Sequence, residues 1–324
     1  MSKPSWYAAH LHYCEPWEEI LSQFLYPWIQ EHLVPQNHPY FFIRYWEMGP
    51  HIRFRFKCSD NDFKLLGPKL EADFDKYVSD RPSSFEFYDF THAHQIPKSW
   101  RLNNSLYWME YYPETERYGG EAALPICEEA FQISSRACLE TFVREKEWNY
   151  NLALTAAIQM HALFTKALGM SRGESRDFFN LVSISWFPRA VDPLGTISES
   201  LKEQKQEETM KAFEDQYERQ KQQLAPFIST IYNALEEDLE EMLEPEMHSF
   251  FVQTAENHKY LEELYQRSMI EDSGWLKYVD NTGITPNKKA LWAIYSSLVH
   301  MTNNRLGILN RDESYIAYLL KEAQ

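Results

Sequence analysis

Glycine, paired cysteines and long apolar runs are all scarce in this sequence. Only 10 of its 324 residues are glycine, which favours few tight loops. The four cysteines lie far apart and form no CxxC pair, so the sequence indicates neither a zinc site nor a disulfide framework. We therefore expect four buried, reduced thiols and no metal.

No apolar run approaches the roughly 20 residues that span a bilayer. The N-terminal stretch MSKPSWYAAH also lacks the apolar core of a signal peptide. These absences predict a cytoplasmic protein without a membrane span. Basic residues are in deficit too, 32 against 48 acidic ones, which gives a net charge of −16 and argues against direct nucleic-acid binding.

The first 120 residues alternate strand and helix patterns, in a chain long enough for two compact units. Period-two and apolar runs predict strands at 6–14, 40–46, 51–58 and 105–113, and amphipathic stretches predict helices at 15–33 and 62–78. This order, β-α-β-β-α-β, is typical of a ferredoxin-like unit, in which the first and third strands are neighbours. His92 and His94, on the connection before the last strand, are expected to be solvated.

From residue 121 onward the pattern is helical. Helix-period stripes predict helices at 123–147, 150–169, 198–224, 227–243, 246–268 and 285–307, the last with Thr285 as N-cap, Pro286 in its first turn and Gly307 at its end. The stretch 198–224 is charged nearly all round, so it is either a solvated helix with many ion pairs or a docking surface. We expect an α+β fold with domains at 1–120 and 121–324 and the active-site cleft between them.

The sequence HIRFRF (51–56) raises the main functional question. In a strand, His51, Arg53 and Arg55 share one face. A hairpin pairing in which residue numbers sum to 97 places Arg44 opposite Arg53, where like charges repel. Either these arginines are solvated, or the face binds an anion such as a carboxylate, for which guanidinium is well suited.

Two further stretches carry side chains suited to ligand binding or proton transfer. In EYYPETERYGG (110–120), Arg117 either pairs with neighbouring glutamates or faces a ligand at the junction of the two halves. In SSLVHMTNNRLG (296–307), His300 shares a helix face with Asn304 and is either a satisfied core residue or a proton-transfer group.

Taken in order, the stretches YFFIRYWEMGPHIRFRF, EYYPETERYGG and SSLVHMTNNRL resemble the C-terminal elimination domain of class I lantibiotic dehydratases and its freestanding relatives, the thiopeptide-type bacteriocin biosynthesis proteins. The resemblance extends from Trp6 to nearly the end. It implies catalytic roles for Arg53, Arg55, Arg117 and His300. We expect a supporting, substrate-binding shell made of Arg44, His51, Tyr118, Asn304 and Arg305. Ser134-Ser135 departs from the Asp-Ser of many relatives.

The resemblance implies a lyase of ribosomal peptide natural product biosynthesis that removes glutamate from glutamylated Ser or Thr, leaving dehydroalanine or dehydrobutyrine without a cofactor. Its expected partners are a precursor peptide and, because this sequence is too short for the glutamylating half, a separate glutamyl-tRNA-dependent enzyme; a homodimer is also suggested. Two alternatives stay open. One is the [4+2] cycloaddition that forms the pyridine of thiopeptides and expels the leader peptide, and the other is a noncatalytic precursor-binding protein. Either way, we expect the three catalytic arginines and His300 to converge on one pocket.

Overall fold

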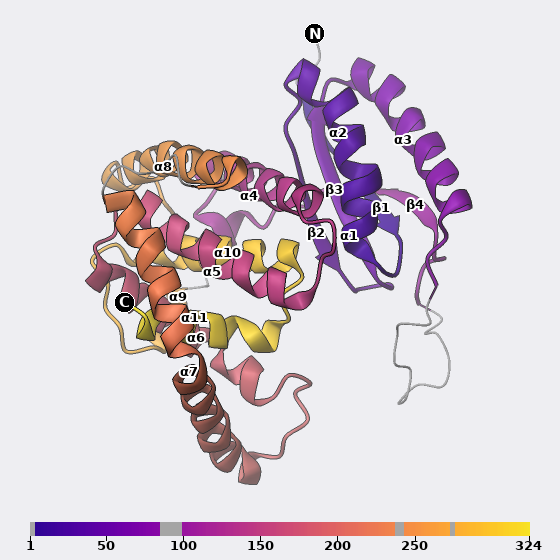
Figure 1. The fold of residues 1–324 in the computed structure, drawn as a ribbon. Helices are drawn as coiled ribbons and strands as arrows, with labels where there is room; N and C mark the ends of the chain where they lie inside the picture. The colour runs from indigo at the N-terminus through magenta and orange to yellow at the C-terminus, as the bar shows by residue number, and fades with distance from the viewer. Residues whose placement is uncertain (1–3, 85–98, 237–242, 273–275) are drawn as a thin grey trace. The chain divides into compact units, whose positions relative to one another are not determined.

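The computed structural model describes residues 4–84, 99–236, 243–272 and 276–324, so His92 and His94 and the end of the predicted helix 227–243 lie outside the described residues. The chain divides into two compact units (Figure 1). The sheet unit comprises residues 1–113 and 134–148, and the helical unit comprises residues 114–133 and 149–324. The predicted domain boundary at residue 120 stays a prediction.

The sheet unit has the predicted β-α-β-β-α-β order. Its elements are β1 (Ser5–His12), α1 (Trp17–Ile20), the π-helical η1 (Leu21–Leu25), α2 (Tyr26–His32), the short 3-10 helix η2 (Val34–Gln36), β2 (Tyr40–Tyr45), β3 (His51–Cys58), α3 (Asp60–Asp80) and β4 (Ser105–Met109). The four strands are antiparallel in the order β2-β3-β1-β4. This topology confirms the ferredoxin-like half and, with the helices described below, the α+β class.

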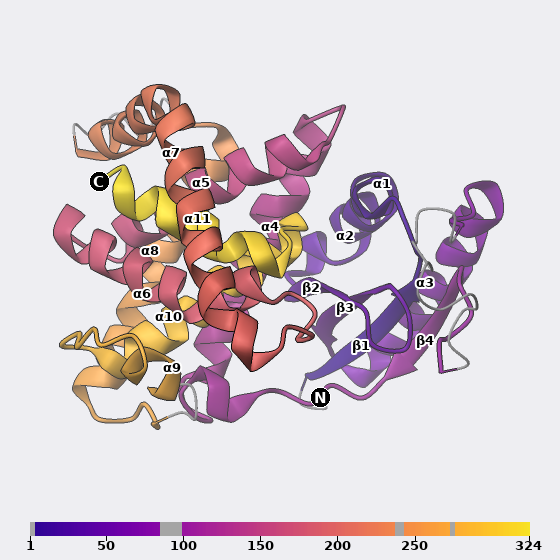
Figure 2. The ribbon, with the colours of Figure 1, turned by 90° about the horizontal axis from the view of Figure 1, so that it is seen from below.

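Alternation along β3 assigns one sheet face to the core. Phe54 and Phe56 are fully buried, and the ring of Trp28 in α2 lies 6.1 and 6.0 Å from theirs. Phe63 of α3 stacks on the same side, so the helices α2 and α3 cover this face (Figures 1 and 2). Because successive side chains alternate, Arg53 and Arg55 emerge on the opposite face.

The helical unit consists of the 3-10 helix η4 (Thr115–Tyr118), the first part of α4 (Leu124–Arg144), α5 (Tyr150–Ala167), α6 (Arg172–Val191), α7 (Glu199–Glu236), α8 (Pro245–Gln266), α9 (Leu276–Asp280), α10 (Lys289–Leu306) and α11 (Asn310–Glu322). The largely apolar α5 contacts α7, α8, α10 and α11 and forms the middle of this unit. The helices α6, α9 and α11 were not among the predicted elements.

Two predicted helix boundaries can be compared with the structure. Thr285 and Pro286 lie outside α10, whose N-cap is Lys288, so the predicted start is wrong by about one turn. A turn at 287–288 instead precedes the helix. Gly307 ends α10 with φ +81°, as predicted, because glycine adopts the left-handed conformation without a Cβ clash.

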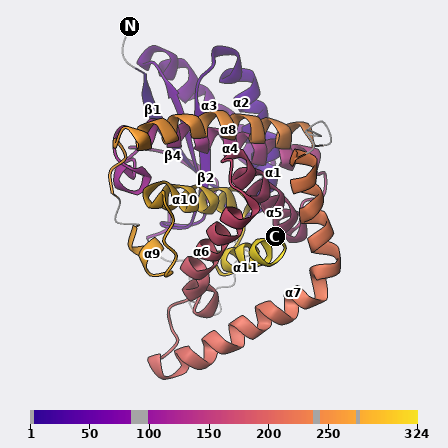
Figure 3. The same ribbon diagram turned by 90° about the vertical axis from the view of Figure 1, so that its left-hand side faces the viewer.

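The longest helix, α7, is confirmed as a charged helix with ion pairs along its surface. Lys205 and Glu208 lie 2.6 Å apart, and similar pairs join Lys202 to Glu199 and Lys221 to Glu218. Figure 3 shows α7 changing direction along its length, and Pro226 inside it removes one backbone donor.

All four cysteines are buried and unpaired, as predicted. Burial raises the pKa of Cys14 and Cys58 to about 12, so these thiols are inert. Within the described ranges, no helix combines the length and the apolar composition that crossing a membrane requires.

Candidate functional site

The pairing register of the hairpin corrects the expected arginine face. Paired residue numbers sum to 96, so Arg53 faces Ile43 and Arg44 faces Ile52. The predicted sum of 97 is wrong because the connection leaves five unpaired residues, 46–50, with Met48 and Gly49 at positive φ. An odd connection shifts the register by one residue, and every side chain of β2 changes face.

Arg44 therefore lies on the face opposite to Arg53. It is 3% exposed, its Nη1 lies 2.6 Å from the Glu18 carboxylate, and its guanidinium lies 5.6 Å from the ring centre of Trp17. The prediction that Arg44 and Arg53 oppose each other is wrong. These contacts fit an ion pair that anchors α1 to the sheet.

Arg53 and Arg55 share the other face with three histidines. Across the ladder, His10 of β1 faces Arg53, and Ala8 faces Arg55. The rings of His10 and His12 stack on that of His51, with centroids 4.9 and 4.5 Å apart. The sheet thus brings together the two arginines of β3 and an imidazole cluster, as expected from the neighbouring first and third strands.

The histidine cluster is neutral near neutral pH. Burial is the largest cause, and together with the nearby arginines it lowers the pKa of His10 and His12 to about 3 and that of His51 to about 4. The positive charge of this face therefore comes from the other side chains that β3 places there, Arg53, Arg55 and Lys57.

His51 also orients Arg53. Its Nδ1 lies 2.7 Å from the Gly49 carbonyl oxygen, which only accepts, so Nδ1 carries the proton. Nε2 then accepts a hydrogen bond from Nε of Arg53 at 3.2 Å. The Arg53 guanidinium also lies 3.3 Å from the ring centre of Tyr45, and these contacts fix its plane.

In the helical unit, Arg117 and His300 line the same pocket. Its volume is about 570 Å³. Besides these two residues, the lining includes Ile184, Trp186, Ser296 and Ser297. Arg117 and His300 lie far apart in the sequence, and the fold brings them to one cavity.

A short 3-10 helix and two glycines hold Arg117 at the pocket. Its Nε donates to Ser297 Oγ at 3.2 Å, and its Nη1 pairs with Glu114 at 3.2 Å. Gly119 ends the 3-10 helix with φ +80°, and a Cβ there would lie 2.8 Å from Cδ1 of Ile294. Arg117 thus pairs with a glutamate, as the first interpretation expected, and it also lines a cavity. That it faces a ligand at the junction of the two halves stays a prediction.

His300 is only 17% exposed, and a buried carboxylate holds its inner nitrogen. Nδ1 lies 2.9 and 3.0 Å from the two carboxylate oxygens of Glu313, which is 1% exposed. The ring stacks on the indole of Trp186 with centroids 4.5 Å apart. An imidazole held in this way can accept a proton, and a guanidinium in the same pocket can stabilise developing negative charge.

The other predicted residues of this half lie deeper or elsewhere. Arg305 is fully buried, its Nη1 donates to the Met301 carbonyl at 2.9 Å, and its guanidinium lies against Phe131. Tyr118 is 4% exposed, and burial raises its pKa well above the usual value. Asn304 is half-buried on α10. Their substrate-binding roles stay predictions.

Glu313, Trp186 and Ser297 are candidate site residues that sequence reasoning missed. A signal for Glu313 was present: it lies on the buried stripe of α11 together with Ile316, Ala317 and Leu320. A carboxylate at such a position needs a buried partner. That partner could not be named without knowing how α11 packs against α10.

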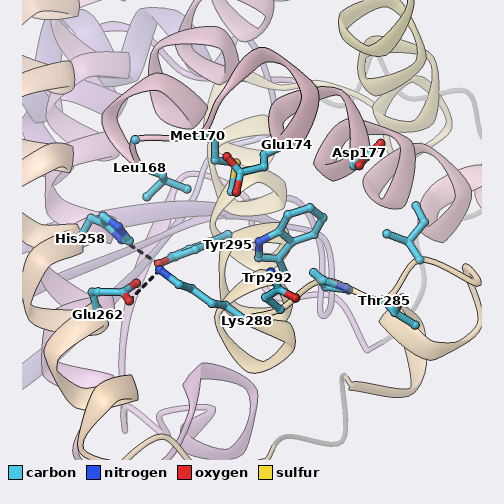
Figure 4. A pocket seen from close by; sticks show the side chains of 14 residues that line it. Leu168, Met170, Glu174, Asp177, His258, Glu262, Thr285, Lys288, Trp292 and Tyr295 are labelled. Carbon is cyan, nitrogen blue, oxygen red and sulfur yellow. Dashed lines mark hydrogen bonds and ion pairs between the residues drawn. The ribbon is translucent and has the colours of Figure 1, made fainter.

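A second cavity, of about 420 Å³, lies elsewhere in the helical unit (Figure 4). Its Tyr295 hydroxyl lies 2.7 Å from Nδ1 of His258, and Nζ of Lys288 lies 2.7 Å from Glu262. Its lining contains one lysine, Lys288, and three carboxylates, those of Glu174, Asp177 and Glu262. This excess of negative charge disfavours binding of an anionic ligand, so the pocket of Arg117 and His300 is the better candidate for the functional site.

Solved structures that share this fold include a pyridine synthase and a lantibiotic dehydratase. The pyridine synthase TbtD from thiomuracin biosynthesis gives a TM-score of 0.64 at 15% identity, over 98% of this chain and 97% of that one. TsrL gives 0.65 at 16% identity, over 100% of this chain and 94% of that one. The tRNA-dependent lantibiotic dehydratase MibB from Microbispora sp. 107891 gives 0.58 at 17% identity, over 100% of this chain but only 28% of MibB.

At such low identities these likenesses show the fold alone. A search of curated proteins gives no match. The family described as "Lantibiotic biosynthesis dehydratase C-term" matches residues 6–324, which is nearly the whole chain and includes all three motifs. The chain therefore belongs to the lantibiotic dehydratase C-terminal domain family.

Proposed function

We propose that this chain is a lyase that eliminates glutamate from glutamylated Ser or Thr of a precursor peptide. The family is one of biosynthetic enzymes that act on ribosomally made peptides, which supports the reaction class. The observation that carries the proposal is the pocket lined by both Arg117 and His300, since elimination requires a base and a group that stabilises negative charge.

In the proposed reaction, the imidazole of His300 removes the Cα proton of the glutamylated residue. The electron pair of the C–H bond forms the Cα=Cβ double bond, and the Cβ–O bond breaks. Glutamate departs as a carboxylate, and the products are dehydroalanine from Ser and dehydrobutyrine from Thr. Arg117 stabilises the charge that develops, and losing such a donor typically costs on the order of 3 kcal/mol of barrier.

Arg53 and Arg55 bind the glutamyl carboxylate of the same substrate in this proposal. Both are half-buried, and aromatic rings hold their guanidinium groups, Tyr45 under Arg53 and Tyr111 4.7 Å from Arg55. A guanidinium that is already oriented loses little side-chain entropy when it binds a carboxylate. His51 supports Arg53 as described above.

The partners in this proposal are a precursor peptide and a separate enzyme that transfers glutamate from glutamyl-tRNA. The chain itself uses no cofactor, acts in the cytoplasm and forms a homodimer. These parts of the proposal rest on the family and on the composition of the sequence. Size-exclusion chromatography with light scattering tests the dimer, which a monomeric mass would contradict.

A second candidate is the cycloaddition that forms a pyridine ring from two dehydroalanines and expels the leader peptide. It is favoured by the length of the match to TbtD, a pyridine synthase, of which this chain covers 97%. The arginine and histidine residues present favour elimination, because cycloaddition releases no glutamate whose charge they would stabilise.

Mass spectrometry distinguishes the two reactions. The protein is incubated with a precursor peptide that carries an O-glutamyl serine, and separately with the same peptide carrying two dehydroalanines. Loss of glutamate from the first supports elimination. Loss of the leader segment from the second supports cyclisation, and binding without either change points to a noncatalytic precursor-binding protein.

Alanine variants test the assignment of residues. Arg55→Ala and His300→Ala should each abolish glutamate release while circular dichroism shows an unchanged fold. Wild-type rates in both variants would contradict the assignment. Arg172→Ala is a matched control, because Arg172 lies on α6 and bonds to Asn233 outside the pocket.

A further inference from the structure

We propose that Glu313 is a positioning residue that holds His300 in the tautomer with the proton on Nδ1, so that Nε2 is the atom that moves the substrate proton. The catalytic part of this inference rests on the proposed elimination. The tautomer itself does not, because it is a property of the protein without substrate.

The contact between the two side chains determines which nitrogen carries the proton. Both carboxylate oxygens of Glu313 lie within 3.0 Å of Nδ1. An ionised carboxylate only accepts hydrogen bonds, so Nδ1 must donate. His300 lines the pocket and Glu313 does not, which leaves Nε2 as the nitrogen available to a ligand.

A second layer of polar groups fixes the carboxylate. Nδ2 of Asn303 donates to Oε2 of Glu313 at 3.0 Å, and Oδ1 of Asn303 lies 2.8 Å from Nε2 of His161. Because an amide oxygen only accepts, Nε2 of His161 donates. Burial lowers the pKa of His161 to about 4, so its imidazole stays neutral and keeps this role near neutral pH.

The four side chains form one continuous line through three helices. His161 comes from α5, Asn303 and His300 from α10, and Glu313 from α11. All except His300 are at most 2% exposed. A buried, fully bonded line of this kind holds the imidazole in one orientation, and the stacked Trp186 restricts the ring plane further.

A positioning role predicts a specific kinetic pattern. Glu313→Gln keeps the size of the side chain but loses its charge and its obligatory acceptor character. It should lower kcat on the order of 100-fold and leave KM within about threefold, since the substrate does not touch Glu313. Glu313→Asp keeps the carboxylate, so its kcat should decrease less than that of Glu313→Gln. Glu246→Gln, a buried glutamate of α8 that does not line the pocket, is the matched control.

The tautomer is tested directly by long-range proton–nitrogen NMR of protein labelled at histidine, with the His300 signals assigned from His300→Gln. We expect the Nδ1–H tautomer in wild type and in Glu246→Gln, and a mixture in Glu313→Gln. An Nε2–H tautomer in wild type would overturn the inference. An unchanged tautomer in a folded Glu313→Gln variant would also overturn it.

These readouts separate the inference from the proposed function. If no glutamate is released by wild type, the proposed function fails while the NMR result still decides the role of Glu313. If glutamate is released and Glu313→Gln retains wild-type kcat, the elimination stands and the positioning role is wrong. Should Glu313→Gln not fold, the wild-type tautomer alone decides whether Nδ1 carries the proton.

Discussion

Nε of Arg53 donates a hydrogen bond to Nε2 of His51, 3.2 Å away, and this bond joins a buried neutral imidazole to an arginine on the face of the sheet. The acceptor is available because the Gly49 carbonyl holds the proton on the other ring nitrogen. A turn glycine thereby determines, through one imidazole, where a charged group points.

His51→Leu should weaken substrate binding more than it weakens the fold. Leucine cannot accept the hydrogen bond from Arg53, but its apolar side chain still fills the fully buried site. We expect KM for the glutamylated peptide to rise on the order of tenfold, as is usual when an orienting partner is lost. His32→Leu, on α2, should leave KM unchanged. An unaltered KM in His51→Leu would show that this bond does not orient Arg53.

The free energy of unfolding should decrease as the pH is lowered, because of the histidine cluster. Burial lowers the pKa of His12 to about 3, whereas an imidazole in the unfolded chain titrates near 6.5. Below about pH 6.5 the unfolded state therefore binds more protons than the folded one. The stability that this difference provides is complete above that pH and is lost as the pH falls toward the folded value.

The slope of this loss can be measured by urea denaturation between pH 7.5 and 5. Each such histidine contributes up to about 1.4 kcal/mol per pH unit. His12→Phe should reduce the slope by about this amount. Tyr107→Phe, whose ring contacts that of His12 on the same face, should retain the wild-type slope. Equal slopes in wild type and His12→Phe would mean that His12 protonates in the folded protein.

Gly119→Ala should destabilise the fold and displace Arg117. Gly119 has φ +80°, and the new Cβ would lie 2.8 Å from Ile294. We expect a loss of about 2 kcal/mol in the free energy of unfolding, with reduced turnover. Gly169→Ala is the matched control, since Gly169 has φ +68° but no atom within 4 Å of an added Cβ. It should cost about 1 kcal/mol and leave turnover unchanged. Equal losses in the two variants would rule out the steric clash as the cause.

Arg44→Met should affect stability and not catalysis. Removing a buried guanidinium leaves the Glu18 carboxylate without its partner 2.6 Å away, which costs about 3 kcal/mol. Lys69→Met, which breaks an exposed pair with Asp73, should cost less than about 1 kcal/mol. After correction for the folded fraction, kcat/KM of Arg44→Met should equal that of wild type. A lower value would restore Arg44 to the substrate-binding shell.

The sheet unit could be predicted well because its order is determined by local patterns. Alternation along 51–58 identified which side chains of β3 share a face, and the β-α-β-β-α-β order placed β1 beside it. Arg44 could not be placed, because its face depends on whether the connection has an odd or even number of residues. That parity depends on the positive φ of Met48, a non-glycine residue whose identity gives no signal for it.

The site in the helical unit was harder to predict from the sequence, because it depends on packing between helices. Family resemblance of their motifs identified Arg117 and His300 as site residues. The sequence around each residue alone did not show whether its side chain lines a pocket or lies in the core. Ser297 and Trp186 become recognisable only when α10 is placed beside η4 and α6. At Ser134-Ser135 only the first position departs from the Asp-Ser of many relatives. Oγ of Ser135, the position that matches, accepts the backbone N–H of Phe42 at 3.2 Å. Because β2 is an edge strand, this bond satisfies a donor that the sheet leaves unpaired.

The contact between His300 and Glu313 makes the pair sensitive to the helical register of α11. His300 lies in α10, which ends at Gly307, and Glu313 lies in the first turn of α11. One residue inserted in α11 between Glu313 and Ile316 would rotate Glu313 by about 100° around the helix axis relative to the buried stripe of that helix. Such an insertion would turn the carboxylate away from the imidazole, so His300 would lose the group that holds its Nδ1.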